Sequence, residues 1–176
     1  DLALGKMISL SVIGLFSGIS SFAGIMLSLP KLMGGLEDVK FGYDVADYYT
    51  IAPRYGTNED ARQLFEEVHK RDMHVLLDLV PGHTSVEHQW FKESMKPERN
   101  EFSDRYIWTD SIWESPEDLP CLRGISDRDG SCSVNFFSTQ PALNYGYYKV
   151  TKPWQMTPED EGPKATLEAM MDVMRF

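Results

Sequence analysis

The alternation of apolar and polar positions is clearest in residues 57–83, where it predicts a helix, a turn and a buried strand. Thr57 can act as the helix N-cap, with Asp60 at the matching capping-box position. Residues 74–80 form a nearly continuous apolar run, as expected of a strand covered on both faces. His83 follows this run, and α/β enzymes place site residues at such strand ends. The apolar face of the helix consists of Ala61, Leu64, Phe65 and Val68.

Residues 7–29 contain no charged side chain and are long enough to span a bilayer. Several Ser and Gly residues dilute this signal. The alternative is a buried helix at about residues 8–19 that leads into a strand at about residues 23–29, ended by Pro30. Periodicity alone does not separate a buried helix from a membrane-spanning one, and we favour the soluble interpretation.

Residues 86–147 show no sustained period and are rich in aromatic and turn-forming residues. An irregular segment of this length in a compact protein is typically functional or a small inserted domain. Seven aromatic residues could give it a core of its own: Trp90, Phe91, Tyr106, Trp108, Trp113, Phe136 and Phe137. Helical spacing returns near the end of the chain, where no stop signal follows it, and we expect a piece of a longer protein. The residues with this spacing are Leu167, Met170, Met171 and Met174.

Length and charge narrow the possible partners. The 176 residues suffice for one domain with a real core. With 27 acidic against 17 basic residues, a net charge of −10 and no basic stripe, the sequence argues against a nucleic-acid partner. Cys121 and Cys132 lie in a loop-like stretch; they could form a bridge in an oxidising compartment, but two free thiols are the simpler interpretation.

Three segments together resemble the α-amylase superfamily, glycoside hydrolase family 13. Residues 42–57 (GYDVADYYTIAPRYGT) are similar to the loop after the family's second barrel strand. Residues 78–85 (DLVPGHTS) are similar to the signature that ends its third strand. Residues 140–145 (QPALNY) are similar to the signature near the end of its domain B. Order and spacing fit, and the form of the motifs is nearer to oligosaccharide α-glucosidases than to large starch amylases.

The resemblance implies an α/β fold, a partial (β/α)8 TIM barrel with an irregular domain B insertion after the third strand. Residues 1–85 would be the N-terminal part of the barrel. Residues 86–147 would be the domain B-like insertion. Residues 148–176 would be a linker and a barrel helix that precedes the fourth strand.

The resemblance also implies roles for four residues. Tyr43 would stack on the sugar at the cleavage subsite, since an aromatic face covers the apolar side of a pyranose. Asp44 would accept hydrogen bonds from sugar hydroxyls, and His83 would donate to one. Asp78 would support a site arginine from the next strand, which this chain does not contain.

No cofactor is expected from these residues. The family often has Asn just before the signature His, where many amylases bind calcium, but this chain has Gly82. A glycine offers no side-chain ligand, so calcium, although possible in a full-length protein, is not supported here. Residues 127–130 (DRDG) resemble a fragment of a calcium loop, although a plain turn is the simpler interpretation.

Catalysis by the family is retaining and needs a nucleophile and a general acid, both carboxylates. The family places them at the ends of the fourth and fifth strands, and a further Asp at the seventh. We therefore expect no catalytic residue in this chain. Glu87, Glu93 and Glu98 are three further carboxylates, and they lie in the domain B-like segment.

Two hypotheses follow. The first is the N-terminal part of an α-glycosidase or transglycosidase whose substrate is an oligosaccharide or another α-glucoside. The rest of the barrel would be needed to complete the site. The second hypothesis is a non-catalytic relative that acts as a binding or transporter-associated protein and is linked to a membrane through residues 7–29. We consider this membrane link the less favoured interpretation of residues 7–29. The sequence favours the first hypothesis because all three motifs occur in order.

Overall fold

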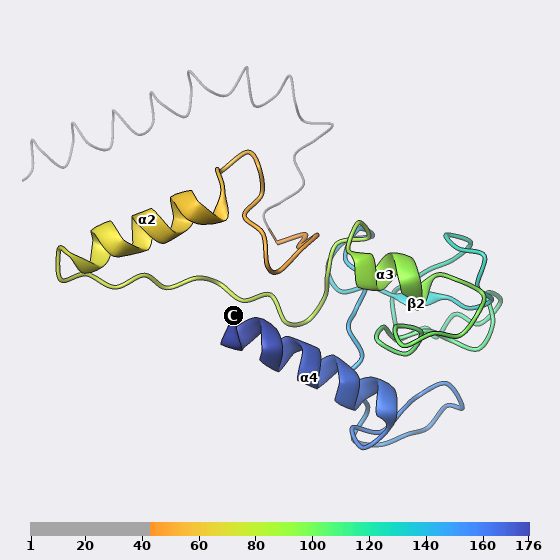
Figure 1. Cartoon of the computed structure of the whole chain (residues 1–176). Coiled ribbons are helices and arrows are strands. Elements are labelled where there is room, and N and C mark those ends of the chain that lie inside the picture. The colour runs from red at the N-terminus through yellow and green to blue at the C-terminus, as the bar shows by residue number, and fades with distance from the viewer. Residues whose placement is uncertain (1–42) are drawn as a thin grey trace, which may run out of the picture. The chain divides into compact units, whose positions relative to one another are not determined.

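The structure is a computed structural model that describes residues 43–176. The contacts within the chain divide it into two units, Asp1–Phe41 and Gly42–Phe176. The predictions for residues 7–29 therefore lie outside the described residues. The described part of the second unit contains, in chain order, α2 (Asn58–His69), α3 (Gln89–Ser94), β1 (Cys121–Leu122), β2 (Cys132–Ser133) and α4 (Glu161–Arg175) (Figure 1).

Helix α2 begins as the sequence predicts. Thr57 is the N-cap, and its hydroxyl oxygen accepts a hydrogen bond from the amide of Asp60 at 3.2 Å. The carboxylate of Asp60 accepts in return from the amide of Thr57 at 2.8 Å, which completes the capping box. The predicted apolar face is only partly covered: Leu64 is exposed, and the helix contains no buried residue.

The predicted buried strand at residues 74–80 is wrong. These residues form no strand in the structure, and Leu76 and Leu77 are 95% and 72% exposed. A strand covered on both faces needs neighbouring strands for its backbone and other elements for its side chains. Within residues 43–176 no segment pairs with residues 74–80 as a strand. The apolar run is present, but the described chain does not cover it.

The irregular segment 86–147 does contain an aromatic core. The ring of Phe91 stacks on Trp108 at 6.0 Å and meets the edge of Tyr106 at 5.0 Å. The other buried members of this core are Cys132, Leu143 and Met170, the last from α4. Trp90 packs against it in a partly buried position. The prediction is wrong for Trp113, Phe136 and Phe137, which are exposed.

The acidic turn at residues 127–130 is tied into this core by its arginine. Arg128 lies over the ring of Trp108 at 4.8 Å and donates to the carbonyl oxygens of Ser94 and Ser103. Burial lowers the pKa of its guanidinium. Asp129 accepts from the amide of Ile112 at 2.7 Å. Arg128 and Asp129 thus have structural contacts of their own.

Both thiols are free, as in the simpler interpretation of the sequence. Strands β1 and β2 pair antiparallel, with Cys121 opposite Ser133 and Leu122 opposite Cys132. The two cysteines are therefore not direct cross-strand partners. Burial raises the pKa of both thiols, and that of the fully buried Cys132 most strongly, so neither is activated as a nucleophile.

The predicted C-terminal helix is confirmed as α4. Its inner side is anchored by the buried Met170 and Thr166; the hydroxyl of Thr166 lies 3.4 Å from the carbonyl oxygen of Arg105, outside the helix. The remaining apolar residues of the predicted face, Leu167, Met171 and Met174, stay exposed. None of the helices in residues 43–176 has the length and apolarity that a bilayer span requires.

His88 makes the stability of this unit depend on pH. It is the N-cap of α3, where its Nδ1 accepts from the amide of Trp90 at 3.1 Å. Burial lowers the pKa of its imidazole to about 4; Asp47 opposes this shift and Arg105 adds to it. The unfolded chain binds this proton near pH 6.5 and the folded chain only near pH 4. The free energy of unfolding should therefore fall as pH drops from 6.5 to 4, by about 2 kcal/mol.

A His88→Asn variant retains a capping acceptor but cannot titrate. We expect its unfolding free energy, measured by urea denaturation, to change much less between pH 6.5 and pH 4 than that of the wild type. His74→Asn, at an exposed position, should keep the wild-type dependence. Equal pH slopes for wild type and His88→Asn would contradict this assignment.

Candidate functional site

The site is built around the backbone of residues 80–83, whose carbonyl groups are held by other parts of the chain. The hydroxyl of Tyr48 lies 2.7 Å from the carbonyl oxygen of Val80 and 3.2 Å from that of His83, and these two acceptors share its one hydrogen. The hydroxyl of Tyr145 donates to the carbonyl oxygen of Pro81 at 2.7 Å. The burial of both phenols raises their pKa values, that of Tyr145 to about 12, so both stay protonated donors at neutral pH.

Backbone hydrogen bonds join the three sequence motifs directly. The amide of Leu143 donates to the carbonyl oxygen of Gly82 at 3.1 Å, and the amide of Thr84 donates to Pro141 at 3.3 Å. These bonds flank an antiparallel bridge between His83 and Ala142. The amide of Ser85 donates to the carbonyl oxygen of Val45 at 2.8 Å. Residues 42–57, 78–85 and 140–145 therefore meet at one place.

His83 lies inside this junction, with only 5% of its surface exposed. Its Nε2 is 3.1 Å from the carbonyl oxygen of Tyr43, and its Nδ1 is 3.1 Å from the side-chain nitrogen of Asn135. The ring of Phe136 meets the imidazole edge-on at 6.2 Å. The resemblance implies that His83 donates to a sugar hydroxyl; in this structure its Nε2 faces a backbone carbonyl oxygen.

Tyr43 and Asp78 contact each other at the outer side of the site. The hydroxyl of Tyr43 donates to a carboxylate oxygen of Asp78 at 3.2 Å. Tyr43 is 56% exposed, so its ring remains accessible. Its backbone is held by His83 and its hydroxyl by Asp78, and these two contacts limit how the ring can turn.

Asp44 is anchored to the segment that carries the third motif. One carboxylate oxygen accepts from the side-chain amide of Gln140 and the other from the hydroxyl of Thr139, each at 2.6 Å. Gln140 is buried, which fixes the direction of its amide. A carboxylate can accept about four hydrogen bonds, so Asp44 has capacity for further donors.

The structure thus brings Tyr43, Asp44, Asp78 and His83 into one neighbourhood. Sequence reasoning missed two polar neighbours, Asn135 and Thr139. Thr139 adjoins the QPALNY motif, and that position could have indicated it. Asn135 sits in an irregular stretch without a periodic or motif signal, so the sequence contained no pointer to it.

The site contains hydrogen-bonding groups and an exposed aromatic ring, and both of its carboxylates already accept hydrogen bonds from other residues. Asp44 accepts two hydrogen bonds and Asp78 accepts one. In residues 43–176 no three side chains of His, Cys, Asp or Glu are grouped so as to hold a metal ion. The neighbourhood thus presents carboxylate acceptors beside an exposed aromatic ring.

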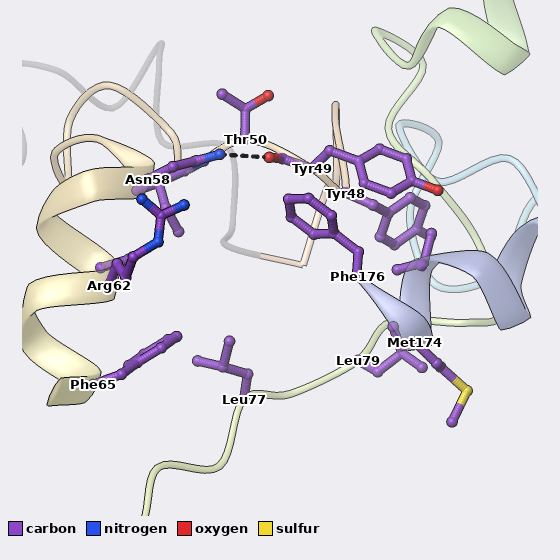
Figure 2. A pocket seen from close by; sticks show the side chains of 13 residues that line it. Tyr48, Tyr49, Thr50, Asn58, Arg62, Phe65, Leu77, Leu79, Met174 and Phe176 are labelled. Carbon is purple, nitrogen blue, oxygen red and sulfur yellow. Dashed lines mark hydrogen bonds between the residues drawn. The ribbon is translucent and has the colours of Figure 1, made fainter. Parts of the chain in front are cut away.

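A separate apolar pocket of about 670 Å³ lies where α2, the extended residues before the site and the end of α4 meet (Figure 2). Phe65 of α2, Leu77, and Phe176 line it, together with Tyr49, whose ring meets Phe176 edge-on at 5.1 Å. None of the four predicted site residues lines this pocket. It gathers apolar side chains that the sequence predicted to be covered.

Comparison with known proteins identifies the family of this chain. Residues 35–157 match the model of the alpha amylase catalytic domain, and the chain therefore belongs to the α-amylase family. The trehalose-6-phosphate hydrolase of Bacillus subtilis is 52% identical over 120 residues, which are 63% of this chain and 21% of that protein. The glucan 1,6-alpha-glucosidase of Streptococcus pneumoniae is 42% identical over 110 residues, 59% of this chain and 20% of that protein. The chain thus spans about a fifth of the length of these relatives.

Solved structures agree with this family. The trehalose-6-phosphate hydrolase of Bacillus licheniformis aligns with a TM-score of 0.58 and 32% identity, over 78% of this chain and 24% of that one. An alpha-glucosyl transfer enzyme aligns with a TM-score of 0.59 and 26% identity, over 76% of this chain and 24% of that one. The architecture is consistent with part of the TIM barrel of these enzymes.

We expect Tyr145 to stabilise the junction through its hydroxyl. Tyr145→Phe removes the donor to Pro81 without changing the ring, and should lower the free energy of unfolding by about 1 kcal/mol. Denaturant titration measures this change, and the amide of Leu143 should exchange faster with solvent. Tyr148→Phe is the matched control, because Tyr148 is fully exposed. Equal stability of the two variants would show that the Tyr145 bond contributes nothing.

Proposed function

We propose that this chain supplies part of the sugar-binding subsite of a retaining α-glycosidase or transglycosidase that acts on α-glucosides. The observation that carries the proposal is the convergence of Tyr43, Asp44 and His83 from segments far apart in sequence. Membership of the α-amylase family and the glucosidase names of its relatives support the substrate class.

Each residue has a role in this proposal. The exposed ring of Tyr43 stacks on the apolar face of the sugar. Asp44 uses its remaining acceptor capacity for sugar hydroxyls, while Thr139 and Gln140 hold it in place. The Nε2–H of His83 exchanges the carbonyl of Tyr43 for a sugar hydroxyl when substrate enters. Asp78 accepts from the hydroxyl of Tyr43 and supports a site arginine from the next strand.

The bond-breaking groups of the proposed enzyme lie in other parts of the barrel. A retaining mechanism needs two carboxylates about 5 Å apart, one as nucleophile and one as acid. The carboxylates of Asp44 and Asp78 are engaged in binding and support. In the proposed arrangement residues 86–147 form domain B, between barrel residues 1–85 and 148–176. The chain then contributes recognition, and elements beyond it contribute catalysis.

Substitution of Asp44 tests this function in the longest natural polypeptide that carries the sequence. That polypeptide should release glucose from one or more of maltose, isomaltose, trehalose and sucrose. Asp44→Ala should lower kcat/KM by about ten- to a hundredfold, because hydrogen bonds to a charged group are lost. Asp110→Ala, at an exposed position outside the site, should stay within about twofold. Absence of turnover on every α-glucoside would refute the proposal, and so would equal activity of the two variants.

The 176-residue chain by itself should show no hydrolase activity. It should also associate with itself, because Leu76 and Leu77 expose apolar surface beside an apolar pocket. Gel filtration and a reducing-sugar assay measure the two properties, with a Leu76→Lys, Leu77→Lys variant as the comparison for association. A monodisperse wild-type chain that cleaves substrate would show that the catalytic groups have been misplaced.

A further inference from the structure

The hydrogen bonds around His83 form a chain in which each group donates to the next, and the side-chain amide of Asn135 is the first donor. The side-chain nitrogen of Asn135 donates to the carbonyl oxygen of Gly82 at 3.0 Å and lies 3.1 Å from Nδ1 of His83. A carbonyl oxygen can only accept, so the amide must present its NH2 group on this side. The NH2 group has two hydrogens, and the two neighbours are two acceptors.

This arrangement determines which imidazole nitrogen carries the hydrogen. Nδ1 of His83 faces a donor and is therefore the unprotonated nitrogen. Nε2 carries the hydrogen and donates it to the carbonyl oxygen of Tyr43 at 3.1 Å, which again can only accept. The relay from Asn135 through His83 to Tyr43 is thus consistent in one tautomer and would oppose a donor to a donor in the other.

Gly82 provides the space that Asn135 occupies. A Cβ atom at this position would lie 3.0 Å from the side-chain nitrogen of Asn135, a tight contact that requires the amide to shift by a few tenths of an ångström. The backbone of Gly82 has no positive φ, so alanine can adopt its conformation. The only effect of a Gly82→Ala substitution is then the contact of its methyl group with Asn135. Gly82 therefore contributes twice, by leaving room for the amide and by offering it a carbonyl oxygen.

We propose that Asn135 is a positioning residue of the sugar subsite, which holds His83 in the tautomer with hydrogen on Nε2. It acts through His83, which presents this hydrogen to the carbonyl of Tyr43 and, during binding, to a sugar hydroxyl. The tautomer part of this proposal depends only on the geometry around His83, and its consequence for sugar binding rests on the proposed function.

Nitrogen NMR of histidine side chains tests the tautomer in the same full-length polypeptide, since the 15N shifts of Nδ1 and Nε2 differ between tautomers. The His83 signals are assigned by their loss in His83→Gln. Wild type should show hydrogen on Nε2. Asn135→Asp replaces the donor by an acceptor and should add a hydrogen to Nδ1, because both ring nitrogens then face acceptors, whereas Asn135→Ala should give a mixture of tautomers. Asn58→Ala removes an amide that bridges backbone groups elsewhere and should leave the spectrum unchanged.

Affinity gives the second readout, with methyl α-D-glucopyranoside as the probe. Asn135→Ala should weaken binding about three- to tenfold, and Asn135→Asp at least as much, while Asn58→Ala stays within about twofold. In turnover assays the loss should appear in KM and leave kcat nearly unchanged. Should both Asn135 variants fail to fold, Gly82→Ala, whose methyl group presses on the same amide, should raise the fraction of His83 with hydrogen on Nδ1.

The two parts can fail separately. An unchanged His83 tautomer in the folded Asn135 variants, or in Gly82→Ala, would overturn the inference. A changed tautomer in a protein that binds no α-glucoside would support the positioning role and refute the proposed function. A changed tautomer with unchanged affinity and KM would overturn the role of Asn135 in sugar binding.

Discussion

The site depends on the way in which four successive carbonyl groups, from Val80 to His83, find hydrogen-bond donors. No strand within the described residues pairs with the run that leads to these carbonyl groups, so they lack the donors that a sheet would supply. Tyr48, Tyr145 and Asn135 supply side-chain donors instead. The direction of the His83 side chain is therefore set by loops that lie far away in sequence.

This pairing of carbonyl groups explains why the polar residues of the site are held in place while nearby apolar side chains remain exposed. The four predicted site residues each contact a residue of another motif, for example Asp44 with Gln140. Directed hydrogen bonds between loops fix positions without a surrounding sheet. The apolar residues depend on burial, which needs layers of packed elements on both sides. Leu77 remains at an open apolar pocket for this reason (Figure 2).

The sequence predicted the features whose causes are local. The Thr57 capping box and the helix at Glu161–Arg175 follow from residues three and four positions apart, and both are present. Residues 74–80 have the apolar pattern of a strand, but strand formation requires partners that a pattern does not supply. The motifs indicated that Tyr43 and His83 belong together. They could not indicate Asn135, because its contact with His83 spans 52 residues of irregular chain.

The polarity of the site has a consequence for recognition. A sugar hydroxyl can donate and accept, so it does not by itself choose between a donor and an acceptor in the protein. In the proposed subsite the carboxylate of Asp44 can only accept hydrogen bonds. The Nε2 of His83 can only donate as long as the amide of Asn135 donates to Nδ1. The protein thereby fixes which hydroxyl gives a hydrogen and which receives one. Selectivity for one sugar orientation then depends on a residue that need not touch the sugar.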